Sequence, residues 1–188
     1  MIKTIDFYRY PKPPLRFCFF DRLPLHQKEE FLWELRKKNP MLEIISYCVM
    51  PNHLHFLLRL LVDVGASDFM RNIQHSYSKY FNTKNGRSDS LFQGMFKAVL
   101  IETEEQLVHV SHYIHLNSVS TYLIEIDELE NYQWFSFPDY IGKSSNSFPV
   151  DTKHVLGSFK SVEDYRQFVF DQADYQRELK KIKHLVLE

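Results

Sequence analysis

The chain has 188 residues and a mass of 22.6 kDa, enough for one sizeable hydrophobic core but hardly for two full domains. Hydrophobic residues make up 44% and charged residues 25%, a balance that excludes a disordered or fibrous protein. No apolar run approaches the roughly 18 residues of a membrane-spanning helix, and the polar N-terminus lacks the apolar core of a secretion signal. Two cysteines, Cys18 and Cys48, cannot form a disulfide framework or a four-cysteine zinc site. We therefore expect a cytoplasmic protein with reduced cysteines and no membrane partner.

The charge is nearly balanced, with 23 Lys and Arg residues against 24 Asp and Glu residues, a net charge of -1 and a pI near 6.8. The whole-chain basic excess that is typical of nucleic-acid binders is absent. The distribution is uneven, because residues 1–120 hold 15 basic and 12 acidic side chains and residues 121–188 hold 8 and 12. This mild asymmetry does not by itself indicate a partner.

The first predicted elements follow the Pro-rich PKPP segment. Residues 15–21 (LRFCFFD) are short, aromatic and apolar, which favours a buried strand. Residues 25–39 place apolar side chains at helical spacing until Pro40 ends the helix. Residues 42–49 and 53–60 are predicted as two strands joined by a turn at Pro51-Asn52.

A second series of elements completes the first 120 residues. An apolar stripe over residues 67–84 predicts a helix with Ser67 as its N-cap and Asn85-Gly86 at its end. Residues 88–92 are predicted as a loop and 94–101 as a fourth strand. Thr103 and Gln106 then form a capping box that begins a helix running to about residue 117.

The order β-α-β-β-α-β-α predicts an α+β fold, a ferredoxin-like βαββαβ sandwich with an antiparallel sheet. We expect residues 1–120 to form a catalytic domain. Residues 121–188 change in character, from an acidic run at 125–130 to an aromatic stretch at 131–141 and amphipathic helices within 161–185. In that last stretch Phe168, Val169, Leu179 and Ile182 are the predicted anchors. We expect residues 121–188 to form a C-terminal extension, with a helical part, that packs on the core or on a partner.

Two histidines, His53 and His55, follow the Pro51-Asn52 turn. Side chains at positions i and i+2 of a strand project from the same face, so we expect the two imidazoles to lie together. One interpretation is a pair of half-buried histidines that happen to alternate. The other is a metal-binding pair, because neutral imidazole is the commonest nitrogen ligand.

A second group of polar residues lies in the last predicted helix of the first 120 residues, in the segment HYIHLN at 112–117. Tyr113 and Asn117 are four residues apart and share one helix face. Each taken alone is typical of an ordinary surface or helix-end residue. In the predicted fold, however, this helix follows the fourth strand and can bring that face near the histidine pair. His115 lies two residues after Tyr113 and so faces away from it.

At this point the sequence resembles a known family. The segments SYCVMPNHLHFLL (46–58), LFQGMFK (91–97) and HYIHLN (112–117) are similar to those of the single-tyrosine HUH transposases, specifically the REP-associated tyrosine transposase branch. The name HUH denotes histidine–hydrophobic–histidine, here His53-Leu54-His55. The resemblance spans roughly residues 15–140 and includes NYQWFSFPDYIG (131–142), which is similar to the family's W-S-S-x-x-x-Y segment.

The resemblance implies a transposase that cleaves and rejoins single-stranded DNA through a covalent 5′-phosphotyrosine intermediate. By match to the motif, Tyr113 is the nucleophile, and His53, His55 and Asn117 ligate Mg²⁺ or Mn²⁺. Two imidazoles and one amide oxygen leave about three positions of an octahedral ion open for phosphate and water. A tyrosine phenol, with an ordinary pKa of about 10, needs help with proton removal at neutral pH. The implied partners are single-stranded DNA with hairpin or repeat structure and, in a homodimer, a second copy; a monomer is the alternative.

The chain departs from the family pattern in three places. The helix usually ends in Asn-Pro, whereas this chain has Asn117-Ser118. The opening V-T-x-R-G strand is not evident. Gln93-Gly94 is followed by Met95 where relatives commonly have Arg or Lys, so this chain has one candidate phosphate ligand fewer. A diverged copy with altered DNA preference or a host-recruited role fits these changes.

Basic and polar side chains on and after the second long helix are candidates for contacts with the DNA backbone, because Lys and Arg neutralise phosphates. A solvated helix face explains the same charges equally well. The candidate DNA-binding residues are Arg71, Lys79, Lys84, Arg87, Gln93 and Lys97.

Two alternative functions stay open. One is a catalytically silent DNA-hairpin-binding protein derived from such a transposase. The other is a zinc hydrolase built on the His-x-His pair, which is a poor tetrahedral site because no Cys, Asp or Glu ligand lies nearby in the sequence.

Overall fold

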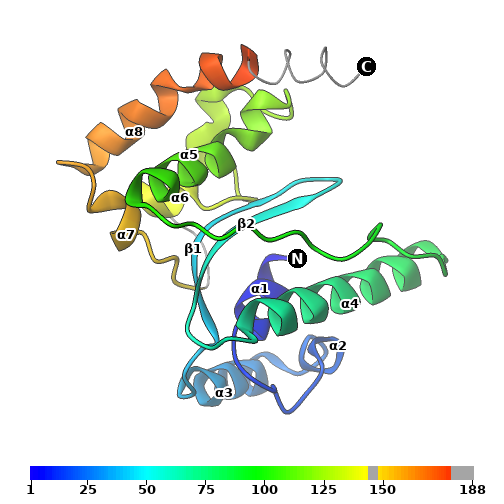
Figure 1. Cartoon of the computed structure of the whole chain (residues 1–188). Helices are drawn as coiled ribbons and strands as arrows, with labels where there is room; N and C mark the ends of the chain where they lie inside the picture. The colour runs from blue at the N-terminus through cyan, green and yellow to red at the C-terminus, as the bar shows by residue number, and fades with distance from the viewer. Residues whose placement is uncertain (144–147, 179–188) are drawn as a thin grey trace. The chain divides into compact units, whose positions relative to one another are not determined.

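A computed structural model describes residues 1–143 and 148–178 of the chain (Figure 1). The fold is α+β: strands β1 (Leu42–Val49) and β2 (Leu54–Leu60) form a two-stranded sheet, and the other regular elements are helical. The chain divides into two compact units. The first comprises Met1–Glu43 and Arg59–Val99, and the second comprises Ile44–Leu58 and Leu100–Glu188. The β1–β2 hairpin thus contributes residues to both.

The first unit is built around aromatic side chains from three short helices, α1 (Ile2–Tyr8), α2 (Phe17–Phe20) and α3 (Leu25–Arg36). Phe7 of α1 is fully buried and its ring lies 5.1 Å from that of Phe20 and 5.7 Å from that of Phe31. Such aromatic pairs stabilise a core by more than the burial of their apolar area alone. They give short helices, which are marginal alone, a common core.

Helix α4 (Gly65–Asn85) completes the first unit and packs against α1 and α2. It ends at Gly86, as the sequence predicts, in the left-handed conformation (φ 62°) that glycine adopts without strain. The predicted N-cap was wrong: Val64, not Ser67, occupies that position. Gly65 allows the earlier start, because a Cβ there would lie only 2.8 Å from the Met41 carbonyl oxygen.

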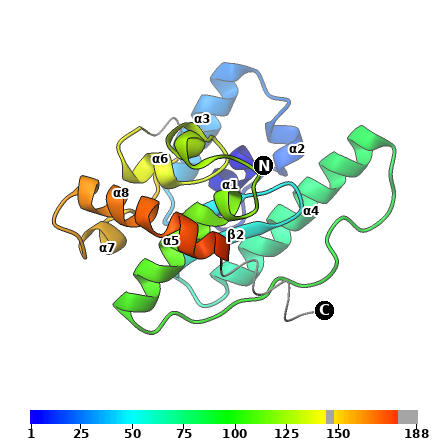
Figure 2. The same cartoon turned by 90° about the horizontal axis from the view of Figure 1, so that it is seen from above.

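The second unit surrounds the turn end of the hairpin with α5 (Glu104–Ser120), the 3₁₀ helix η1 (Ile126–Asn131), α6 (Phe137–Tyr140), α7 (Lys153–Leu156) and α8 (Val162–Asp171). Helix α8 lies alongside α5 in two perpendicular views (Figures 1 and 2). Fully buried Cys48, Leu116 and Phe135 are part of the shared core. Neither cysteine forms a disulfide, and Cys18 is only partly buried.

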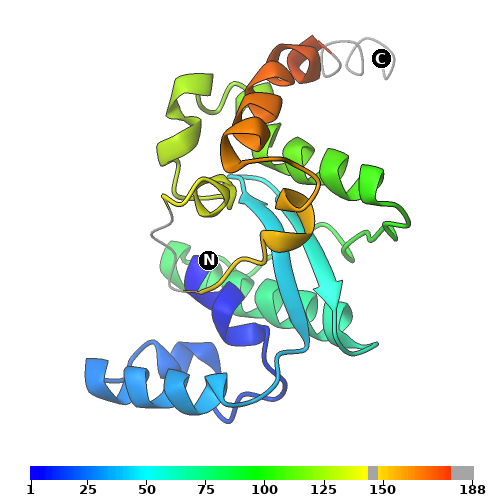
Figure 3. The same ribbon diagram turned by 90° about the vertical axis from the view of Figure 1, so that its left-hand side faces the viewer.

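Two segments from beyond residue 120 pair with the backbone of β1. Val49 N–H donates to the Trp134 carbonyl at 2.7 Å, and Ser136 N–H donates to the Tyr47 carbonyl at 3.0 Å. Nearer the start of β1, Asp151 N–H donates to the Ile44 carbonyl at 2.8 Å, where the chain before α7 runs beside the strand (Figure 3). The residues after 120 therefore share the core and the backbone hydrogen bonds of β1.

Two of the four predicted strands were wrong. Residues 15–21 contain the helical turn α2, because Phe17 and Phe20, three residues apart, both pack on Phe7. Residues 94–101 form no strand, and Met95, Val99 and Leu100 are 94%, 87% and 79% exposed. An apolar run becomes a strand only when another strand pairs with it. The described residues therefore form an α+β fold with two of the four predicted strands, and not the complete ferredoxin-like sandwich.

The other elements predicted within the first 120 residues are confirmed, with shifted ends. Helix α3 and both strands of the hairpin lie where the sequence predicts them, and α5 begins after Thr103, whose side chain accepts from Gln106 N–H. Helix α5 runs to Ser120 rather than 117. Of the predicted C-terminal anchors, Val169 is fully buried, whereas Leu179 and Ile182 lie outside the described residues. None of the described helices combines the length and apolarity needed to cross a bilayer.

Candidate active site

The turn between β1 and β2 places the two predicted histidines together. Met50 N–H donates to the His53 carbonyl at 2.9 Å, which closes the turn over Pro51-Asn52. His53 immediately precedes β2 and His55 is its second residue. Their ring centroids lie 4.8 Å apart in an edge-to-face arrangement of 86°. The two half-buried imidazoles are therefore close enough to serve one ion.

The residue before the pair sets the tautomer of His53. Its Nδ1 lies 2.6 Å from Asn52 Oδ1. An amide oxygen can only accept, so Nδ1 carries the proton and Nε2 presents a lone pair. Metal-binding histidines commonly have the second nitrogen held in this way. The donor set of two imidazoles thus fits a divalent ion.

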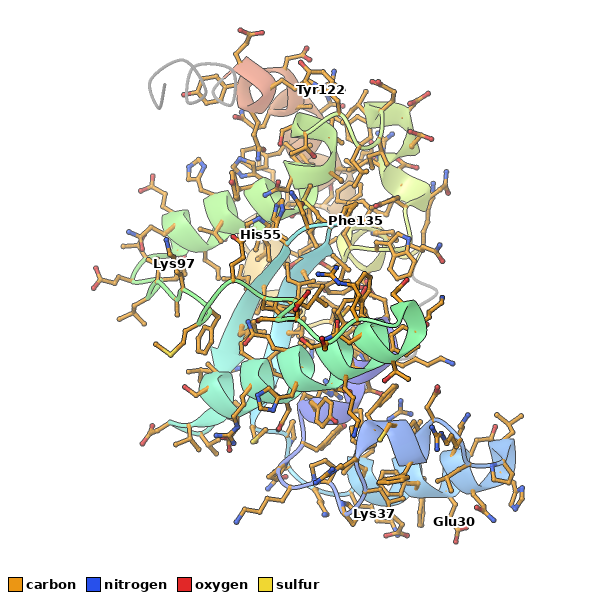
Figure 4. All side chains as sticks on the ribbon, turned by 90° about the vertical axis from the view of Figure 1, so that its right-hand side faces the viewer. Glu30, Lys37, His55, Lys97, Tyr122 and Phe135 are labelled. Carbon is orange, nitrogen blue, oxygen red and sulfur yellow. The ribbon has the colours of Figure 1, made fainter. Side chains whose placement is uncertain are left out.

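Tyr113 lies on α5 and faces the histidine pair within the second unit. Its ring centroid is 6.0 Å from that of His55, at 82° between the planes. Figure 4 shows His55 on the hairpin, on the side covered by α5. The Tyr113 side chain is 37% exposed, so a substrate can reach it. The structure thus brings together three of the four proposed catalytic residues, His53, His55 and Tyr113.

Asn117, the fourth, lies one helical turn after Tyr113 and is buried at 1% exposure. Its carbonyl accepts from Thr121 N–H at 3.2 Å and from Thr121 Oγ1 at 2.8 Å. The helix therefore continues past the position where the family usually has proline. Ser118 in place of that proline allows this extension, because proline disfavours the helical conformation of the residue before it.

A buried residue of α5, expected from its spacing to face away from Tyr113, is central to the packing of this helix. His115 is fully buried, with Nδ1 2.9 Å from Tyr165 Oη and Nε2 2.9 Å from Ser136 Oγ. Burial lowers the pKa of His115 to about 3 and that of His112, on the same helix, to about 4. Ser136 belongs to the W-x-S-x-x-x-Y segment, which is the signal that could have revealed this contact.

A series of hydroxyl groups in hydrogen-bonding distance of one another leads from His115 to β1. Ser111 Oγ lies 3.0 Å from both Tyr165 Oη and Ser46 Oγ, and Ser46 Oγ lies 3.1 Å from Tyr140 Oη. Tyr140 in turn donates to the Ile45 carbonyl at 2.9 Å. Burial raises the pKa of Tyr140 to about 12 and that of Tyr165 well above its ordinary value. Both phenols stay protonated, and their burial keeps them out of reach of a substrate.

The candidate DNA-contacting residues all belong to the first unit, whereas the candidate catalytic residues belong to the second. Arg71 forms an ion pair with Asp68 at 2.6 Å. Lys84 lies over the Tyr80 ring at 5.8 Å and Arg87 over the Phe81 ring at 5.9 Å. The side chains of Lys79, Gln93 and Lys97 are exposed. Exposed cations beside aromatic rings suit a nucleic-acid strand.

Comparison with protein-family models gives one match. The model of the family described as "Transposase IS200 like" matches residues 18–117, more than half of the chain. No curated protein and no solved structure matches the chain. The matched range includes both histidines and ends at Asn117, so it covers the four candidate catalytic residues. The chain belongs to the IS200-like transposase family.

Proposed function

We propose that this transposase cleaves and rejoins single-stranded DNA through a covalent link between Tyr113 and a 5′-phosphate, as expected of the REP-associated tyrosine transposase branch. The observation that carries the proposal is the 6.0 Å separation of the Tyr113 and His55 rings within one unit, with His53 directly beside His55. Tyr113 is the tyrosine of α5, and it is accessible where Tyr140 and Tyr165 are buried.

In the proposed reaction the Tyr113 oxygen attacks the scissile phosphorus after losing its proton. A new P–O bond to tyrosine forms while the bond from phosphorus to the 3′-oxygen breaks. That oxygen takes up a proton from water and leaves as a 3′-hydroxyl, which balances the proton that the Tyr113 phenol gives up to water. The phosphodiester count is unchanged, so a 3′-hydroxyl can later attack the phosphotyrosine and release Tyr113 without an external energy source. Covalent catalysis of this kind divides one difficult exchange into two steps.

We assign Mg²⁺ or Mn²⁺ to His53, His55 and Asn117. The observation in favour is the Asn52 contact, which leaves the Nε2 lone pair of His53 as the one able to ligate. When bound, such an ion acts as a Lewis acid on the phosphate and lowers the cost of the developing charge. The protein's own part is to orient the imidazoles from a hydrogen-bonded hairpin turn and to hold the phenol opposite them on α5.

The functional division at residue 120 belongs to this proposal as well. Residues 1–120 contain every proposed catalytic and DNA-contacting residue. Residues 121–178 supply Ser136, Tyr140 and Tyr165, which contact α5 and β1. On this view the C-terminal extension supports the site without touching DNA at the cleavage point.

The test is a cleavage assay with 3′-labelled single-stranded DNA from the flanking genomic repeats in Mn²⁺. We expect labelled protein on a denaturing gel, lost with EDTA and lost in Tyr113→Phe. Tyr122→Phe is the matched control, because Tyr122 is also exposed and lies just after α5, and it should retain the adduct. A Tyr113→Phe variant that cleaves like the parent would refute the proposal.

The same preparation separates the alternatives. DNA that is retarded on a native gel but never cleaved favours the catalytically silent hairpin-binding protein. Elemental analysis that finds stoichiometric, tightly held zinc favours the histidine-ligated hydrolase. Weak, exchangeable Mn²⁺ favours the transposase.

A further inference from the structure

A chain of buried hydrogen bonds runs through the second unit from α6 to β1, and it passes through α5. Its members come from five places: Ser136 before α6, His115 and Ser111 on α5, Tyr165 on α8, Tyr140 on α6 and Ser46 on β1. Ser46, Ser111, His115 and Ser136 are fully buried, and Tyr140 and Tyr165 are exposed by at most 1%. The proposed catalytic reaction uses none of these groups.

The contacts admit one complete assignment of protons. Tyr140 donates to the Ile45 carbonyl, so it must accept from Ser46, which then accepts from Ser111. Ser111 accepts from Tyr165, which leaves Tyr165 Oη to accept from His115 Nδ1–H.

His115 Nε2 is then an acceptor and receives the Ser136 proton. Ser136 Oγ accepts in turn from Tyr47 N–H at 2.9 Å. The reverse assignment would direct the Ser136 proton to the more distant Tyr47 carbonyl, at 3.3 Å, and leave the Ser46–Tyr140 contact without a proton. A hydroxyl group has one proton to donate, so only the first assignment makes every shorter contact.

From this geometry we infer that His115 is a positioning residue: as the Nδ1–H tautomer, hydrogen-bonded at both ends of its ring, it fixes the rotation of α5 and so places Tyr113 opposite the histidine pair. This inference rests on the proposed function. His115 is two residues from Tyr113, about 200° around the helix, and so holds α5 from the side opposite the site. His115 does so through two hydrogen bonds, one from its Nδ1–H to the Tyr165 hydroxyl and one from the Ser136 hydroxyl to its Nε2.

A second contact acts on the same turn of helix. Gln176, after α8 and 6% exposed, donates from Nε2 to the Tyr113 carbonyl at 3.1 Å. Tyr165 contacts Ser111 and His115, on either side of Tyr113, and Gln176 contacts the Tyr113 carbonyl itself, so one C-terminal stretch holds this turn of α5. Apolar packing tolerates small rotations of a helix, whereas hydrogen bonds are directional. A displacement of 1 Å at reacting atoms can lower a rate by roughly 100-fold, so such a restraint has a kinetic consequence.

The tautomer is measured directly by ¹⁵N NMR of histidine-labelled protein. We expect the His115 Nδ1 resonance to be of the protonated type and the Nε2 resonance of the unprotonated type. In Tyr165→Phe the Nδ1 proton loses its acceptor, and both resonances should shift. An Nε2–H tautomer in the parent protein would overturn the assignment.

The positioning role is measured by single-turnover cleavage of single-stranded DNA by Tyr165→Phe. We expect the cleavage rate to fall by roughly 10- to 100-fold at saturating DNA, with the Kd for DNA within twofold of the parent. Val169→Ala is the matched control: Val169 is one turn along α8 and fully buried, so its truncation lowers Tm without touching the chain of hydrogen bonds. It should retain the parent's rate. Equal rates in the two variants at equal Tm would overturn the inference.

A readout without catalysis separates this inference from the proposed function. The Tyr113 ring resonances should shift in Tyr165→Phe and stay in place in Val169→Ala, whether or not the parent cleaves DNA. Unchanged Tyr113 resonances in Tyr165→Phe would contradict the positioning role. A parent that forms no adduct, with the resonance shifts observed, would overturn the proposed function alone.

Discussion

At the scale of single residues, similar side chains in the second unit differ in what their surroundings let them do. Tyr113 is 37% exposed beside two imidazoles, whereas Tyr140 and Tyr165 are buried phenols with a raised pKa. His53 and His55 are partly exposed at a turn, whereas burial keeps His115 neutral. Burial separates the groups that can react from the groups that hold the framework.

Asn52→Ala tests the orientation of the proposed metal ligand. Without the Asn52 oxygen, the His53 ring loses its fixed tautomer, so we expect the Mn²⁺ concentration for half-maximal cleavage to rise by roughly 10- to 100-fold. Saturating Mn²⁺ should restore the rate, because no reacting group is removed. A metal titration of cleavage provides the measurement, and an unchanged half-maximal concentration would disprove the role of Asn52.

At the scale of elements, α5 is the helix on which the proposed mechanism depends, and local chemistry sets its start but not its end. Its start at Thr103 was predictable, because a side-chain cap and the following Gln106 are visible in the sequence. Its end was not, because a helix without a terminal Gly or Pro continues until its packing stops. The same difference separates Gly86, which is a visible stop for α4, from Val64, which is no recognisable start.

Thr103→Ala should lower the free energy of unfolding by about 0.5–2 kcal/mol, since the Gln106 N–H loses its acceptor. Ser67→Ala is the matched control, an exposed serine near the start of α4 that caps nothing, and we expect a change within about 0.5 kcal/mol. Urea unfolding of both variants is the measurement. Equal losses would mean that the cap at Thr103 contributes no stability.

The buried histidines of α5 predict a loss of stability in mild acid. The folded-state pKa is about 4 for His112 and about 3 for His115, both below the ordinary value of 6.5, so between those pH values the unfolded chain binds more protons. Stability is therefore complete above pH 6.5 and falls as the pH falls, by up to about 1.4 kcal/mol per pH unit for each group.

The check is urea unfolding of the parent and of His112→Phe at pH 7 and pH 5. Phenylalanine keeps a ring against Phe168 and removes one titrating group, so the loss between the two pH values should be smaller in the variant. The same loss in both proteins would show that His112 does not contribute to it.

Sequence patterns predicted the hairpin and its histidine pair because alternation, a turn signal and i, i+2 spacing are all local. They failed for residues 15–21 and 94–101, because an aromatic or apolar run does not reveal what it packs against. Phe17 and Phe20 pack on Phe7, and Val99 is largely exposed. The contact between His115 and Tyr165 was also out of reach, because Tyr165 is 50 residues away in the chain. Tertiary contacts of that range leave no periodic signal.

At the scale of the whole molecule, the two units differ in charge. Residues of the first unit include 15 basic and 9 acidic side chains, a net of +6, and those of the second include 8 and 15, a net of -7. The near-neutral total conceals this difference. Lys and Arg side chains of the basic first unit can neutralise DNA phosphates and release their counterions, which favours binding. The candidate contact residues all belong to this unit.

Lys79→Gln/Lys84→Gln should weaken single-stranded DNA binding and reduce the slope of log affinity against log salt by roughly 0.7 for each phosphate that is no longer neutralised. Lys153→Gln/Lys160→Gln removes the same charge from the second unit and should leave the slope unchanged. Fluorescence anisotropy at several salt concentrations is the measurement. Equal slopes for the two double variants would mean that net charge alone, and not α4, drives binding.

The measurement that tests the central claim most directly is the position of the covalent link. After cleavage in Mn²⁺, the adduct is trimmed with nuclease, digested with trypsin and sequenced by mass spectrometry. Residues 98–143 form one tryptic peptide with four tyrosines, Tyr113, Tyr122, Tyr132 and Tyr140. The proposed mechanism predicts a nucleotide on Tyr113 alone. A nucleotide on another tyrosine, or cleaved DNA with none bound to protein, would contradict it.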